Sequence, residues 1–327
     1  MELDWDVVGH QKQIEYLQKT IKNGKIGHAY LISGPKNVGK NNLALNFIYT
    51  LYCTGPDKKK PCHKCDNCSQ LKKQIHPDFI HIQPEEEGKI IAIKQIRGAI
   101  EKISKKTLSN NYKICLIEKA DLLSLEAANA LLKTLEEPKG KTVIILTADK
   151  NTLPETIISR CQTISLQPVP AQDIYDFVLN KTNSRDQAST ISRLSMHLPG
   201  KSEAFLKNKN AIKKINSATS DFVSLLAIKG IEKNRLQEKI IKKQEKNNEI
   251  LNKIQVWQSI LRDLLMVQNF HEEYIFNREY IDQLERTAKT ITTKKIITNI
   301  NKLEIIKNNN KKNINTKLAL DNFLLNL

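Results

Sequence analysis

Residues Gly34 to Asn41, which read Gly-Pro-Lys-Asn-Val-Gly-Lys-Asn, have the spacing of a phosphate-binding loop. Gly34 and Gly39 would let the backbone wrap closely around a phosphate, and Lys40 would add a positive charge. The pattern ordinarily ends in Ser or Thr, whose hydroxyl binds Mg²⁺, but here that position is Asn41. The loop therefore predicts phosphate binding beside a weakened metal site. The alternative is a chance match to the pattern.

Four of the six cysteines, namely Cys53, Cys62, Cys65 and Cys68, lie close together and include two overlapping Cys-x-x-Cys pairs. In a reducing compartment such a cluster indicates metal binding instead of disulfides. Four thiolates suit a tetrahedral Zn²⁺ with no open position, so the site would fold the insert and not catalyse. Free thiols, an iron–sulfur cluster, or His63 as a substitute ligand are the alternatives.

The elements around the loop fit its proposed role. An apolar segment at 29–33 predicts a buried strand, and after Lys40 apolar residues recur with helical spacing. Strand, glycine-rich turn and helix is the context in which a phosphate loop works. Four further apolar segments, separated by amphipathic helical patterns, predict strands at 79–82, 112–118, 142–147 and 161–166. This alternation predicts an α/β fold with a doubly wound parallel sheet.

The pattern changes at Pro168-Val169-Pro170, beyond which every segment has helical periodicity. We therefore predict an α/β domain at 1–168, with the cysteine module at 53–68 inserted in it. A small helical unit at 169–208 and a longer helical domain at 209–327 would follow.

The composition is that of a globular protein, with 40% hydrophobic and 27% charged residues. No apolar run approaches the length of a membrane span, and the acidic start has no apolar signal region, so we expect a cytoplasmic protein. The net charge of +17 invites a nucleic-acid partner, but lysines are spread along the chain and compositional bias explains them equally well. Aromatic residues, at 6%, leave few platforms for stacking single strands.

Together, these motifs resemble the clamp-loader branch of the AAA+ ATPases, and within it the delta-prime subunits of bacterial DNA polymerase III. The match covers roughly the first 200 residues, with the motifs in the expected order. Besides the phosphate loop and the cysteine insert, it is carried by Val8-Gly9-His10, Gly27-His28-Ala29-Tyr30-Leu31, Leu131-Leu132-Lys133-Thr134-Leu135-Glu136-Glu137-Pro138 and Ser159-Arg160-Cys161. The resemblance implies an AAA+ phosphate-loop sheet, a helical lid at 169–208 and a C-terminal collar domain for oligomerisation at 209–327.

The sequence departs from the active members of this family at two positions. In those members the strand at 112–118 ends in Asp-Glu, of which the first holds Mg²⁺ through water and the second polarises the attacking water. Here these positions are Glu118 and Lys119, and an ammonium group cannot accept a proton. With Asn41 as a second defect, the resemblance implies a subunit without ATPase activity of its own. Whether the loop still binds ATP stays open.

The resemblance also implies roles for three further residues. Arg160 would act as an arginine finger, reaching into the ATP site of a neighbouring subunit; the alternative is an arginine in a salt bridge at a helix end. Thr147 would lie at the nucleotide-sensing position of its strand, and Lys201 at the second sensor position, where active relatives usually have Arg.

The expected function is thus that of a hydrolysis-deficient clamp-loader subunit in DNA replication, which helps place the sliding clamp on primed DNA. Its expected partners are the gamma/tau and delta subunits, the clamp and primer-template DNA. Two alternatives are an active motor subunit of the gamma/tau type and a zinc-containing DNA-binding module. The stoichiometry of the assembly and the surfaces that contact the clamp or DNA stay open.

Overall fold

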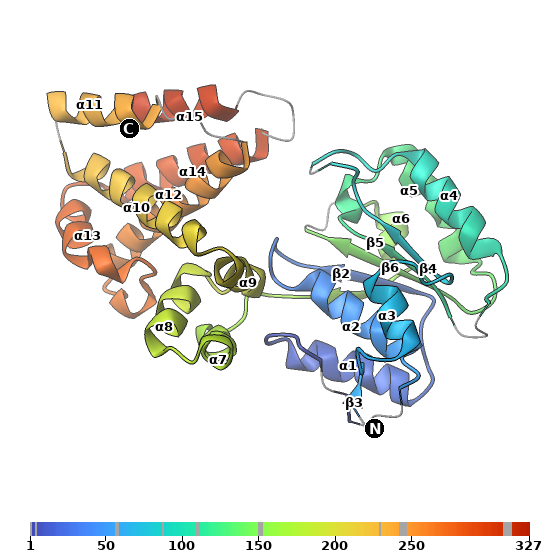
Figure 1. The fold of residues 1–327 in the computed structure, drawn as a ribbon. Coiled ribbons are helices and arrows are strands. Elements are labelled where there is room, and N and C mark those ends of the chain that lie inside the picture. The colour runs from blue at the N-terminus through green and yellow to red at the C-terminus, as the bar shows by residue number, and fades with distance from the viewer. Residues whose placement is uncertain are drawn as a thin grey trace. The chain divides into compact units, whose positions relative to one another are not determined.

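The computed structural model describes residues 2–3, 5–55, 59–86, 88–108, 112–149, 153–228, 230–241, 247–309 and 316–327. The chain divides into two compact units, one of Met1–Ala188 with His197–Lys201 and one of Ser189–Met196 with Ser202–Leu327 (Figure 1). The predicted boundaries at 168 and 208 stay predictions. Among the described residues, no helix is both long and apolar enough to cross a membrane.

A five-stranded parallel sheet forms the centre of the first unit, in the strand order β4-β5-β6-β2-β7. Every residue of its three central strands is buried, as expected where helices cover both faces. The predicted strands and their parallel arrangement are confirmed. The strands are β2 (Ala29–Ser33), β4 (Phe79–Ile82), β5 (Lys113–Ile117), β6 (Thr142–Ala148) and β7 (Gln162–Ser165).

Helices pack on both faces of this sheet, so the doubly wound prediction is confirmed as well (Figure 1). Side chains alternate between the faces: Tyr30 and Ile32 enter one core, and Leu31 enters the other. The first core is completed by α1 (Gln11–Lys22), α2 (Lys40–Tyr52) and α3 (Asp66–Lys72), and the second by α4 (Ile93–Ser104), α5 (Leu125–Glu136) and α6 (Glu155–Ile158).

Shorter elements complete this unit. Strand β1 (Glu2–Leu3) pairs in parallel with β3 (Lys59–Lys60), which lies within the cysteine insert. A 3₁₀ turn, η1 (Ala120–Leu122), follows β5, and α7 (Ala171–Thr182) follows β7. Two further helices, α8 (Arg185–Leu194) and α9 (Pro199–Lys207), contain the divisions between the units.

The second unit is entirely helical where it is described, which confirms the predicted change of pattern. Its core surrounds Trp257, whose ring stacks on Phe222 with the centroids 4.7 Å apart. Val223, Leu261 and Leu264 are buried in this core, and Leu226 is partly buried against it. The helices are α10 (Lys209–Ala227), α11 (Ile231–Ile241), α12 (Asn247–Gln268), α13 (Ile281–Ala288), α14 (Thr293–Asn309) and α15 (Thr316–Leu325), with the 3₁₀ turns η2 (Glu272–Tyr274) and η3 (Arg278–Tyr280).

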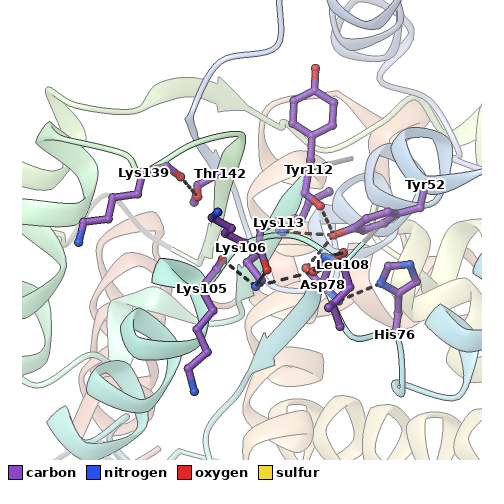
Figure 2. A network of polar contacts seen from close by, with 11 residues as sticks. Tyr52, His76, Asp78, Lys105, Lys106, Leu108, Tyr112, Lys113, Lys139 and Thr142 are labelled. Carbon is purple, nitrogen blue, oxygen red and sulfur yellow. Dashed lines mark hydrogen bonds and ion pairs between the residues drawn. The ribbon is translucent and has the colours of Figure 1, made fainter. Parts of the chain in front are cut away.

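A buried polar network joins the end of α2 to strands β4 and β5 (Figure 2). The Tyr52 hydroxyl lies 2.7 Å from the carbonyl of Asp78 and 2.9 Å from that of Tyr112, and it accepts a hydrogen bond from the Ile114 N–H. The fully buried Asp78 carboxylate lies 3.7 Å from the Lys113 ammonium, which compensates its charge. The network fixes the helix that begins at the phosphate loop against the sheet.

We predict that Tyr52→Phe lowers the free energy of unfolding by about 1–3 kcal/mol, because the Tyr112 carbonyl loses its contact with the hydroxyl, while the Ile114 N–H and the Asp78 carbonyl keep the hydrogen bond between them. Urea unfolding measures the change. The matched control is Tyr49→Phe on the same helix, where the ring is half-buried against His63, and it should change stability by less than about 0.5 kcal/mol. Equal losses in both variants would contradict the role given to the Tyr52 hydroxyl.

Candidate nucleotide and metal sites

The phosphate loop lies between the carboxyl end of β2 and the start of α2, as the sequence predicts. A side chain at Gly34 would place its Cβ 2.5 Å from the carbonyl oxygen of Leu166, so the loop passes too close to the chain after β7 for any other residue. Gly39 has φ 109°, a conformation that other residues rarely adopt. The path of the backbone therefore requires glycine at both positions, and their contact with a phosphate stays a prediction.

Lys40 is nearly buried and turns back onto its own loop. Its ammonium donates to the carbonyls of Gly34, at 2.9 Å, and Pro35, at 2.8 Å, and forms an ion pair of 2.9 Å with Asp149. Asp149 directly follows β6, at the same sheet edge as the loop, and sequence reasoning missed it. The signal that could have found it is its place at the carboxyl end of a buried parallel strand.

Three residues predicted from separate motifs meet at this edge. The Asn41 amide nitrogen donates to Glu118 at 2.5 Å, and the Thr147 hydroxyl donates to the Asn41 amide oxygen at 2.9 Å. They come together because β6 lies between β2 and β5, so the three strands end side by side. The Lys119 N–H also lies 3.3 Å from the Thr147 hydroxyl.

His81 on β4 is a further member of this group. Its Nε2 lies 2.9 Å from the second carboxylate oxygen of Glu118. An ionised carboxylate only accepts hydrogen bonds, so Nε2 carries the proton in this contact. The signal that could have found it is the pairing of the strands, since β4 lies directly beside β5.

Lys201 lies on α9, outside this group of contacts, and its sensor role stays a prediction. The residue before it touches the loop: the Gly200 N–H donates to the Asn37 carbonyl at 2.8 Å. A Cβ at Gly200 would lie 2.9 Å from that oxygen, so a glycine allows this close approach.

The four predicted cysteines converge, with all their Sγ atoms within 4.8 Å of one another. Tetrahedral coordination at a Zn–S distance of 2.3 Å would place sulfurs about 3.8 Å apart, so small adjustments suffice. Among the described residues, the group consists of Cys53, Cys62, Cys65 and Cys68 and does not include His63, whose exposed ring packs on Tyr49. Residues 56–58 of the predicted module lie outside the described part of the chain.

The backbone of the insert already supports thiolates. N–H groups of Cys62 and Cys65 point at the sulfurs of Cys53 and Cys62, each at 3.4 Å. Burial opposes ionisation of Cys65, but backbone and thiol hydrogen bonds together lower the pKa of this thiol to about 6. Backbone hydrogen bonds also lower the pKa of Cys62, whereas burial raises the pKa of Cys53 and of Cys68. These residues could bind a metal ion such as zinc.

Arg160 follows α6 and is held within its own chain. Its Nη2 lies 2.5 Å from the Glu136 carboxylate, and its Nη1 donates to the Thr156 carbonyl at 2.8 Å. The side chains of Arg160 and Glu136 are 34% and 48% exposed, so solvent reaches both. Glu136 belongs to the segment Leu131–Pro138 and was not expected to contact Arg160.

We predict that Gly34→Ala destabilises the chain by about 1–3 kcal/mol, because its methyl group would overlap the Leu166 carbonyl. Gly98→Ala is the control: Gly98 is exposed within α4, with no heavy atom within 4 Å of an added Cβ, so this change should stabilise by up to about 1 kcal/mol. Urea unfolding of both variants tests the opposite signs, and a tolerated alanine at position 34 would contradict the proposed close contact.

Comparison with known proteins identifies the family. A family model described as "DNA polymerase III, delta subunit" matches residues 9–170. The delta-prime subunit of Bacillus subtilis is 32% identical over 198 residues, which are 60% of this chain and 59% of that protein. The chain thus spans about three fifths of the length of that relative.

A gamma subunit is similar over a longer stretch. The gamma subunit of Buchnera aphidicola subsp. Schizaphis graminum is 30% identical over 301 residues, which cover 85% of this chain and 82% of that protein. Among solved structures, a gamma-subunit-related protein of Thermotoga maritima aligns over 96% of this chain and 97% of that one, with 21% identity and a TM-score of 0.46. On the sequence relationships, the chain belongs to the family of DNA polymerase III clamp-loader subunits.

Proposed function

We propose that this clamp-loader subunit is of the delta-prime type: it does not hydrolyse ATP and supplies Arg160 to the ATP site of a neighbouring subunit. In the assembled loader it would help to place the sliding clamp on primed DNA. Its partners would then be gamma/tau and delta subunits, the clamp and primer-template DNA. The observation that carries the proposal is a contrast within this chain. Its own phosphate-loop site has Asn41 and Lys119 in place of the residues that hydrolysis needs, whereas the Arg160 side chain is accessible to solvent.

The site's own chemistry supports the first half of this proposal. Hydrolysis needs a group that orients and deprotonates water, and Lys119 offers an ammonium at that position. The loop residue that would bind Mg²⁺ through a hydroxyl is Asn41, whose amide is hydrogen-bonded to Glu118 and Thr147. Lys119 affects the activation of water and Asn41 affects the binding of Mg²⁺. Because hydrolysis needs both functions in the same site, compensation for one of them would not restore turnover.

The position of Arg160 supports the second half. The guanidinium is tethered by one exposed carboxylate and one carbonyl, and an exposed ion pair of this kind contributes only about 0–1 kcal/mol. A neighbouring subunit's triphosphate, which carries several negative oxygens, could therefore recruit the side chain. A guanidinium placed at a transferring phosphoryl group stabilises the charge that develops there.

A motor subunit is the second candidate, because the gamma subunit relative is similar over most of the chain. Asn41 and Lys119 oppose it. Multiple-turnover ATP hydrolysis by the purified chain would establish the motor function and refute the delta-prime assignment.

We predict that Arg160→Ala slows hydrolysis at the neighbouring site by a factor on the order of 10³–10⁵. The assay reconstitutes the loader with gamma/tau, delta, the clamp and primed DNA, and follows one round of ATP hydrolysis at the subunit next to this chain. Turnover of the whole assembly will fall less, because other sites keep their own fingers. Unchanged single-round rates would refute the finger.

Two controls separate chemistry from folding. The isolated Arg160→Ala chain should lose less than about 1 kcal/mol of stability, because the ion pair that it removes is exposed. Arg185→Ala removes an exposed arginine elsewhere in the same unit and should leave hydrolysis unchanged. A similar loss of activity in both variants would point to general charge instead of a finger.

We further propose that the cysteine module binds one structural zinc ion. Four thiolates fill a tetrahedral shell, so the ion would stabilise the fold of the insert without a position open to substrate. The surroundings fit this role, because a Cβ at Gly55 would lie 2.5 Å from the Cys62 sulfur and the Lys60 ammonium donates to the Cys53 carbonyl at 2.7 Å.

We predict that Cys65→Ser lowers zinc affinity by more than about 100-fold and destabilises the insert. Elemental analysis should find about one zinc per wild-type chain, and chelation should lower the unfolding midpoint. Cys161→Ser, a change at a half-buried cysteine outside the cluster, is the control and should keep its zinc. Visible absorption from an iron–sulfur cluster, or a metal-free protein of wild-type stability, would overturn the assignment.

A further inference from the structure

We infer that the Asn41 amide occupies the place of the divalent metal, so that this phosphate loop neither needs nor responds to Mg²⁺. The inference rests on the hydrogen bonds among Asn41, Glu118, His81 and Thr147, which we call the amide cluster. It concerns the chain's own site and does not depend on what Arg160 does in an assembly.

Each of the four side chains of the amide cluster makes a hydrogen bond to another member of the cluster. The carboxylate of Glu118 receives the Asn41 amide on one oxygen, at 2.5 Å, and His81 on the other, at 2.9 Å. The Thr147 hydroxyl donates to Asn41 at 2.9 Å and lies 3.3 Å from the Lys119 N–H that can donate to it. Both ends of the Asn41 amide are therefore used, and its orientation is fixed by its neighbours.

Mg²⁺ does not fit this arrangement. The ion demands close, near-octahedral oxygen ligands, whereas Asn41 presents N–H hydrogens to the carboxylate that would hold the metal. The amide oxygen of Asn41 is turned toward Thr147. A cation could approach only after these contacts were broken, and Glu118 would also have to release His81.

The amide is a suitable replacement for the metal because Glu118 is a largely buried carboxylate, with 15% of its side chain exposed. Such a group is costly to bury unless it is hydrogen-bonded. A bound Mg²⁺ would stabilise the Glu118 carboxylate with its positive charge. In the amide cluster, two hydrogen-bond donors, Asn41 and His81, stabilise it instead. The ammonium group of Lys40 is likewise paired within the protein, with Asp149, and does not need a bound phosphate to balance its charge.

The test is Asn41→Asp in the isolated full-length chain. This change replaces a donor with a second carboxylate beside Glu118 and so creates a pair of acidic groups suited to Mg²⁺. Without divalent ions the variant should melt at a lower temperature than wild type. Millimolar Mg²⁺ should raise its midpoint by about 2 °C or more, and leave wild type unchanged relative to NaCl of equal ionic strength.

Asn42→Asp is the matched control, because Asn42 is the exposed neighbour on the same helix turn and contacts the Asp6 carbonyl instead of Glu118. It should show no response to Mg²⁺. A Mg²⁺-dependent rise in wild type, or an equal response of the two variants, would overturn the inference.

A second measurement uses only the wild-type chain, so it tests the inference even if the Asn41→Asp chain does not fold. Titration of wild type with a fluorescent ATP analogue should give the same curve with Mg²⁺ as with EDTA, whether that curve shows binding or none. Binding that becomes at least about tenfold tighter with Mg²⁺ would show a functioning metal site and refute the inference.

Discussion

The hydrogen bond from Asn41 to Glu118 is the contact on which the arrangement of the phosphate-loop site depends. It joins the first turn of α2 to the residue that follows β5, and so connects the helix of the phosphate loop with the edge of the sheet. With this bond in place the buried carboxylate is stabilised by protein groups alone. The sheet and the phosphate loop are thus kept, while the carboxylate at the loop is paired within the protein.

Helix α2 connects this site with the rest of the first unit. Its first residue is Lys40 and its last is Tyr52, which anchors the helix in the buried network of Asp78 and Lys113 (Figure 2). The next residue, Cys53, is the first member of the cysteine cluster. The phosphate loop therefore precedes α2, the buried network holds its last residue, and the cysteine module begins directly after it. Because all three are joined to one helix, a displacement of one requires the helix, and with it the others, to shift.

Much of the fold could be predicted from the sequence, because the signals were local. Apolar runs marked each strand of the sheet, and the Ser124 side chain caps α5 by accepting a hydrogen bond from the Ala127 N–H, as serine commonly does at a helix start. Spacing alone identified the four cysteines. The contacts of His81 and Glu136 could not be predicted, because each depends on which strands or helices become neighbours, and that information is not local in the sequence. Asp149 had a local signal, its place after a buried strand, but its partner Lys40 lies far away in the sequence.

The ion pair between Arg160 and Glu136 has a consequence for how such a subunit would meet another molecule. A side chain that already has a partner does not present a bare charge, so encounters with stray anions are discouraged. An anion that binds Arg160 must displace the Glu136 carboxylate. A group with several negative charges competes better for the guanidinium than a group with one. Since an exposed ion pair contributes only about 0–1 kcal/mol, the resting contact favours partners with dense negative charge only modestly.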